Sequence, residues 1–98
     1  MSSYLAQAER VRFLVEPDHI KQWIEQNLAE SAVEIQGDGQ HFFAVIVCPA
    51  FAGKTRIQQH QMVYGALGDR MKSEIHALSM RTLTPDEWRA EQSSEGQE

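Results

Sequence analysis

The chain has 98 residues and a formal net charge of -5, and 42% of its residues are hydrophobic. This length suits one domain with one core, and the acidic balance argues against strong, indiscriminate binding to DNA. The lone cysteine, Cys48, excludes an intramolecular disulfide and predicts a reducing, cytoplasmic setting, while the longest apolar run, residues 42–52, is far shorter than the roughly twenty residues of a membrane span.

The first predicted elements are an N-terminal extension and a helix. Residues 1–16 mix helical spacing with strand-like alternation and lack the pattern of a signal peptide, so we assign them to an extension whose order depends on docking. A helix is predicted from Pro17, because proline suits the first helical turn and Asp18 complements its positive end. Its apolar side chains form one stripe: Ile20, Trp23, Ile24 and Leu28.

A hairpin is predicted next. Val33 and Ile35 alternate with polar residues, and residues 37–40, Gly-Asp-Gly-Gln, form a strong turn signal. Residues 41–48 are apolar and rich in strand-forming types, which indicates a buried strand that ends before Pro49. Two such runs around a glycine turn predict antiparallel strands.

A longer helix and a third strand follow. The helix is predicted over residues 56–71, with Thr55 placed to cap it. Gly65 and Gly68 each weaken its interior by about 1 kcal/mol relative to alanine, so a break near Gly68, giving two short helices, is an alternative. Residues 74–83 alternate in polarity and predict a strand that carries His76.

The last predicted element is a short helix with a disordered tail. Residues 84–87, Thr-Pro-Asp-Glu, match a capping box with proline at the first helical position, and Trp88 anchors the helix. Residues 92–98 are polar and acidic, and we expect them to be disordered. The element order predicts an α+β domain over residues 17–91, in which helices pack on one face of a three-stranded sheet.

The sequence carries no convincing enzyme signature. Gly53-Lys54-Thr55 resembles the end of a phosphate-binding Walker A loop, but the position five residues before Gly53, where that loop needs glycine, holds Cys48. The carboxylates are scattered, and no serine or cysteine lies in a recognisable nucleophile setting. We therefore predict that the protein is not an enzyme.

The four histidines are the remaining candidates for chemistry: His19, His41, His60 and His76. Neutral imidazole binds metals, although a structural or solvated role is the more common one for a single histidine. No His or Cys pair has zinc-site spacing. A metal centre on this chain would therefore have to be shared with another molecule.

Five short motifs follow one another along the chain: Gly37-Asp-Gly-Gln-His-Phe42, Phe51-Ala-Gly-Lys-Thr-Arg56, Gln59-His-Gln-Met-Val-Tyr64, Ile75-His-Ala-Leu78 and Thr82-Leu-Thr-Pro-Asp-Glu-Trp88. Their order and spacing resemble those of the BolA family, over roughly residues 17–88. Five linked motifs are a specific signal, whereas any one of them alone is weak. The resemblance implies a class II KH-like fold, which agrees with the element order expected from the residues.

The resemblance also implies a partner and a cofactor. BolA-like proteins pair with monothiol glutaredoxins, and the heterodimer holds a [2Fe–2S] cluster with ligands from the glutaredoxin, glutathione and the BolA-like chain. The histidine of the Ile-His-Ala-Leu motif corresponds to His76. The second family ligand lies in the first strand–strand loop, where this chain has Asp38 at the cysteine position and His41 as the nearest histidine. Replacing thiolate by imidazole lowers the negative charge around a cluster and raises its reduction potential.

The resemblance assigns the helix of residues 56–71 and the turn before it to partner docking. We expect four residues to contact the partner: Phe51, Gly53, His60 and Tyr64. The free protein is expected to be a monomer or a weak homodimer. We thus predict an adaptor for iron–sulfur trafficking or iron sensing, with His76 and His41 as cluster ligands.

Two other functions remain open from the sequence. Some BolA relatives are transcriptional regulators, and a basic helix–turn–helix region could contact phosphates through Lys54, Arg56, Arg70 and Lys72. KH domains clamp single strands with a GxxG loop, and Gly65-Ala-Leu-Gly68 has that spacing, with apolar residues where basic ones are preferred. A module that binds a partner without metal is the third function.

Overall fold

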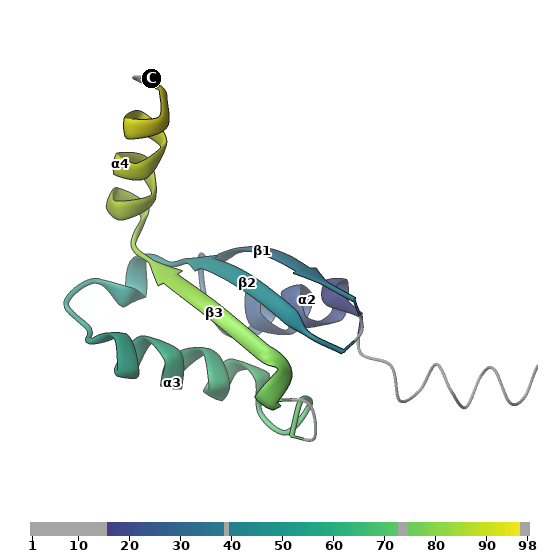
Figure 1. The fold of residues 1–98 in the computed structure, drawn as a ribbon. Helices are drawn as coiled ribbons and strands as arrows, with labels where there is room; N and C mark the ends of the chain where they lie inside the picture. The colour runs from purple at the N-terminus through teal and green to yellow at the C-terminus, as the bar shows by residue number, and fades with distance from the viewer. Residues whose placement is uncertain (1–15, 39, 73–74, 97–98) are drawn as a thin grey trace, which may run out of the picture.

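The computed structural model describes residues 16–38, 40–72 and 75–96. Its elements, shown in Figure 1, are α2 (Pro17–Asn27), β1 (Ala32–Gly37), β2 (Phe42–Val47), the 3₁₀ turn η1 (Pro49–Phe51), α3 (Arg56–Leu67), the 3₁₀ turn η2 (Ile75–Ala77), β3 (Leu78–Leu83) and α4 (Pro85–Gly96). The α+β order predicted from the sequence is confirmed. The extension predicted over residues 1–16 lies almost entirely outside the described residues.

The three strands form one mixed sheet in the order β1-β2-β3. β1 and β2 are the predicted antiparallel hairpin, with Val33 opposite Ile46. β3 pairs parallel to β2, with Phe42 opposite Leu78, and α3 lies in the connection between these strands. A parallel pair needs such a long crossover, whereas a hairpin does not.

One face of the sheet carries the core. Along β2, Phe42, Ala44 and Ile46 are buried, because alternate side chains of a strand point to the same face. α2 and α3 pack on this face and against each other, as Figure 1 shows. The helices contribute Ile20, Ile24, Val63, Ala66 and Leu67 to the same buried cluster.

The start and the end of α3 have identifiable causes. Thr55 caps the helix: its side chain accepts a hydrogen bond from the Gln58 N–H, and the Gln58 side chain accepts one from the Thr55 N–H. Gly68 ends it in a positive-φ conformation, at φ 59° and ψ -136°, which favours glycine. The predicted end of this helix at residue 71 is therefore wrong: the break near Gly68 that was the alternative is present, but residues 68–72 form turns rather than a second helix.

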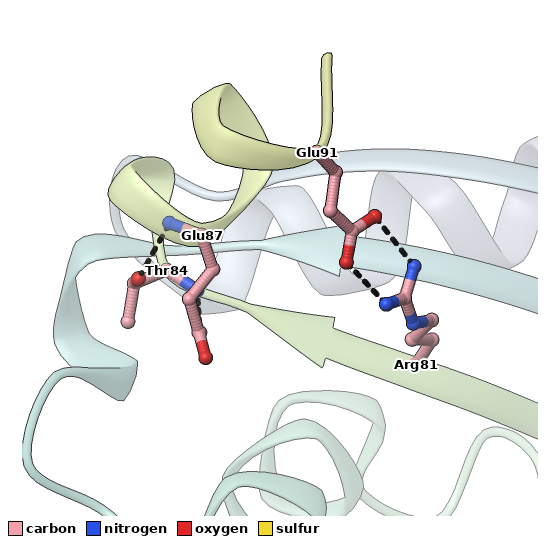
Figure 2. Close-up of polar contacts among 4 residues, drawn as sticks. All are labelled: Arg81, Thr84, Glu87 and Glu91. Carbon is pink, nitrogen blue, oxygen red and sulfur yellow. Dashed lines mark hydrogen bonds and ion pairs between the residues drawn. The ribbon is translucent and has the colours of Figure 1, made fainter. Parts of the chain in front are cut away.

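Two further predicted boundaries are wrong. The third strand begins at Leu78, because residues 75–77 form the turn η2. The last helix continues to Gly96, so residues 92–96, which we expected to be disordered, are helical. Figure 2 shows two contacts that order this helix: the Thr84–Glu87 capping box and the ion pair of Arg81 with Glu91.

None of the helices that the structure describes combines the length and the apolar composition needed to cross a membrane.

Candidate metal and partner site

His41 and His76 lie around the same hollow. This open hollow of about 530 Å³ is found where the β1–β2 turn meets η2, and both histidines line it. Strand register explains the meeting, because Phe42 and Leu78 are opposite each other at the start of two parallel strands. His41 directly precedes β2 and His76 lies just before β3, so both fall at the same end of the sheet. Both side chains are exposed.

Asp38 holds the turn that carries His41. Its Oδ1 atom accepts hydrogen bonds from the backbone N–H groups of Gln40 and His41, each at 2.8 Å. The hydrogen bond from His41, followed by that from Gln40, holds the pKa of the Asp38 carboxyl below its ordinary value. Asp38 is therefore a carboxylate that orders the turn.

Gly37 lets the hairpin close at this point. A Cβ atom at Gly37 would lie 2.4 Å from Cδ1 of the Phe42 ring and 2.8 Å from the carbonyl oxygen of His41. Such distances are well below van der Waals contact, so a side chain here would force the ring or the turn to move. The absence of a side chain at Gly37 thus allows the Phe42 ring and the His41 carbonyl to approach the backbone here.

η2 presents His76 to solvent. The side chains on either side of it, Ile75 and Ala77, are partly buried and pack against the core. The short 3₁₀ turn therefore has two inward anchors and one outward imidazole. The prediction that His76 begins a strand is wrong, because it lies in η2, two residues before β3 starts.

The donor set around this hollow is incomplete for a metal. Within residues 16–38, 40–72 and 75–96, no three His, Cys, Asp or Glu side chains come together in a way that could hold a metal ion. The Cys48 thiol is buried, and its S–H donates to the carbonyl oxygen of Ala29 at 3.4 Å. Two exposed imidazoles beside an open hollow fit a centre whose other ligands come from a second molecule.

The predicted docking residues fall into different environments. Phe51 is fully buried in the core, so the prediction that it contacts a partner directly is wrong. Gly53 is exposed in the turn after η1, with φ 77°, and Tyr64 is 40% exposed on α3. His60 is half-buried and lines a second hollow, between α3, β3 and α4, away from the pair His41 and His76.

The predicted basic residues do not form one patch. Lys54 and Arg56 lie at the start of α3, and Arg70 and Lys72 follow its end. α3 has 12 residues, which at about 1.5 Å per residue separates the two pairs by roughly 18 Å. The Arg70 guanidinium lies 5.9 Å from the centre of the Trp23 ring, a cation–π contact with α2.

Gly65-Ala-Leu-Gly68 is not an exposed loop. Its first three residues belong to α3, and Ala66 and Leu67 are buried. A nucleic-acid clamp needs backbone that a phosphate can approach. This segment is therefore the end of a packed helix.

Sequence reasoning missed Gln59. Its side-chain amide donates to the carbonyl oxygens of Phe51 and Lys54, each at 3.1 Å, and its oxygen accepts from the Thr82 hydroxyl at 2.6 Å. The residue thereby ties the turn before α3 to β3. The position of Gln59 beside His60, in one of the five motifs, was the sequence signal that could have identified it. No sequence signal indicated the ion pair of Arg81 with Glu91.

Comparison with known proteins relates the chain to one family. Residues 16–87 match the family model described as BolA-like protein. The acid stress protein IbaG of Escherichia coli (strain K12) is 35% identical over 75 residues, which cover 76% of this chain and 89% of that protein. The DNA-binding transcriptional regulator BolA of Haemophilus influenzae is 38% identical over 56 residues, 57% of this chain and 54% of that protein. The match thus spans about half the length of that relative.

A solved structure supports the same relationship. A bolA protein homologue from Coxiella burnetii superposes with a TM-score of 0.71 and is 53% identical. The match covers 78% of this chain and 99% of that one. The two chains are therefore similar in sequence as well as in fold.

Proposed function

Because the chain belongs to the BolA-like family, we propose that it is an adaptor that binds a monothiol glutaredoxin and shares a [2Fe–2S] cluster with it. The observation that carries the proposal is the meeting of His41 and His76 at one open hollow. These two residues come from segments far apart in the sequence. Iron–sulfur trafficking or iron sensing is the task that such a shared, exposed centre would serve.

His76 and His41 would supply the imidazole ligands of the cluster, and the partner with glutathione would supply thiolates. When bound, the cluster provides electron-accepting iron whose potential rises with each thiolate replaced by imidazole. The protein's own contribution is to hold two neutral donors in place. Asp38 holds the turn that carries His41 and Gly37 leaves room for it, while Ile75 and Ala77 anchor η2 on either side of His76.

The surroundings of the hollow suit a docked protein. Phe43 is 48% exposed and lines this hollow as well as the second one. An exposed aromatic ring beside polar ligands is typical of a protein interface. The partner would cover Phe43 and close the hollow from its open side.

The test is reconstitution with a monothiol glutaredoxin, glutathione, iron and sulfide under anaerobic conditions. The proposal expects a coloured heterodimer whose visible circular dichroism changes in His76→Ala, and changes less in His41→Ala. His19→Ala is the matched control, because His19 is an exposed histidine on α2 that lies outside the hollow. A heterodimer with unchanged spectra in both hollow variants would contradict cluster ligation, and a colourless heterodimer would favour a metal-free binding module.

A DNA-binding regulator is the second candidate, favoured by the name of the Haemophilus influenzae relative. Lys54 and Arg56 are exposed next to each other at the start of α3 and could contact neighbouring phosphates. The test is salt-dependent binding to duplex DNA. The double substitution Lys54→Ala with Arg56→Ala should weaken binding and reduce the salt slope, while Arg70→Ala with Lys72→Ala serves as the control at the other end of the helix.

A further inference from the structure

The two edges of the sheet differ in how their backbone groups are used. On the β1 edge, the Val33 N–H donates to the Glu25 carboxylate of α2 at 3.0 Å, and α2 packs along this strand. β3 is the other outermost strand, and Figure 1 shows α3 beneath it and α4 extending from its end.

The register of β3 shows which groups face its outer edge. The Leu83 carbonyl oxygen accepts from the Cys48 N–H at 3.0 Å, on the β2 side. The N–H and C=O of one residue in a strand point to the same side, and this side alternates along the chain. Met80 and Thr82 therefore direct their backbone N–H and C=O groups outward, where the described part of the chain provides them with no backbone partner.

A hollow of about 630 Å³ accompanies this edge. Met80 and Thr82 line it from the face that packs on the helices, and Phe43 lines it from the opposite face. The hollow thus wraps around the edge of the strand. Its size and its position leave room for an extended segment beside β3.

The side chains on the two walls of the hollow differ in charge. On the α3 wall, Arg56 and His60 line it. On the α4 wall lie two carboxylates: Glu91, which is paired with Arg81, and Glu87, which accepts a hydrogen bond from the Thr84 N–H, as Figure 2 shows. The positive side chain available to a bound segment is therefore Arg56, on the side of α3 and away from these carboxylates, while Phe43 offers apolar surface on the other face of the sheet.

We propose that the free edge of β3 binds an extended peptide segment of a partner protein as a fourth strand of the sheet. The segment carries acidic side chains toward α3 and apolar side chains toward Phe43, because alternate residues of a strand face opposite sides. Ser79 of β3 is the register partner of Phe43 of β2, so the two side chains lie on the same face of the sheet. Because the Ser79 side chain is small, it leaves the Phe43 ring within reach of a strand added beside β3. This surface shares Phe43 with the hollow of His41 and His76, but neither histidine lines it, and the added strand does not depend on a cluster.

The experiment uses the full chain and a phage-displayed library of random twelve-residue peptides. The proposal expects selected peptides with alternating acidic and apolar residues. In amide hydrogen exchange measured by NMR, a synthetic copy of such a peptide should slow the exchange of Met80 and Thr82 at least tenfold, while Ser79 and Arg81, already bonded to β2, change less. This measurement needs no variant, so it holds even where substitutions on β3 disturb folding.

Two substitutions test the charge assignment. Arg56→Gln should weaken peptide binding about two- to fivefold, the range of an exposed ion pair, and Arg70→Gln, beyond the other end of α3, should leave it unchanged. His76→Ala should also leave peptide binding unchanged, which separates this proposal from cluster ligation.

Protection of Met80 and Thr82 without peptide, rising with protein concentration, would overturn the proposal in favour of a second copy of the chain. Failure to select peptides, peptides that protect other amides, or protection by an oligonucleotide alone would also overturn it.

Discussion

The two ends of the sheet are built in opposite ways. Where β2 and β3 begin, His41 and His76 stand exposed on short turns around an open hollow. Where these strands finish, Phe51 is fully buried, Gln59 joins the turn before α3 to β3, and α4 is tied to the sheet by an ion pair. The chain thus places its exposed candidate ligands at one end of the sheet and its buried anchor at the other. Removing an exposed histidine should change ligation with little effect on folding, whereas removing the buried Phe51 side chain should change folding.

Phe51→Ala should have the largest effect on stability. Removing a fully buried aromatic side chain is expected to lower the free energy of unfolding by about 3–5 kcal/mol, measured by urea denaturation. His76→Ala, which removes an exposed side chain, should leave the unfolding midpoint nearly unchanged. Equal losses in the two variants would contradict the division between the two ends.

Gly37→Ala should have a smaller effect that spreads from the turn to the hollow. The added methyl group would clash with the Phe42 ring and the His41 carbonyl, at an expected cost of about 1–3 kcal/mol. NMR shifts of His41 should move with the loss of stability. Gly65→Ala is the matched control, because a Cβ atom there meets open space within α3. An unchanged free energy of unfolding in Gly37→Ala would contradict the expected clash and show that the turn tolerates a side chain.

Glu91→Gln should loosen α4 without a measurable change in global stability. The hydrogen bonds from Arg81 lower the pKa of the Glu91 carboxyl and support the ion pair, but both side chains are substantially exposed. Amide exchange within α4 should become faster, while exchange in β2 stays the same. The adjacent Gln92→Ala, at an exposed position, is the control. Unchanged exchange in α4 would mean that the capping box alone orders this helix.

The smallest expected effect is the pH dependence of the β1–β2 turn. The pKa of Asp38 in the folded protein lies below its ordinary value of 3.8, so the carboxylate stabilises the turn above that value. This contribution is lost as the pH falls through the lower, folded-state pKa. NMR shifts of the Gln40 and His41 amides should follow that titration and lose it in Asp38→Asn. Amides that titrate with a midpoint above 3.8 would contradict the assignment.

Most of the fold could be predicted from local patterns. The glycine turn, the helical stripe that contains Ile20 and Ile24, and the cap at Thr55 all act between neighbouring residues, and the structure agrees with them. The boundary of the third strand was missed because alternation in residues 74–77 imitates a strand. The length of α4 was missed because Glu91 gains its partner, Arg81, only after the chain has folded.

The candidate site was predictable in part. The hollow brings together His41 and His76 through the parallel pairing of β2 and β3, which no local pattern specifies. The burial of Phe51 also depends on packing, and it made a predicted contact residue part of the core. Residues in a motif can thus serve the fold and the site side by side.

Pulsed electron paramagnetic resonance of the reduced heterodimer with a monothiol glutaredoxin tests the central claim most directly. If His76 and His41 are cluster ligands, the spectrum contains strong nitrogen hyperfine couplings, and each of the variants His76→Ala and His41→Ala removes one of them. His60→Ala, which alters a histidine of the other hollow, retains both. A cluster without strong nitrogen couplings, or couplings that survive both hollow substitutions, would contradict the account.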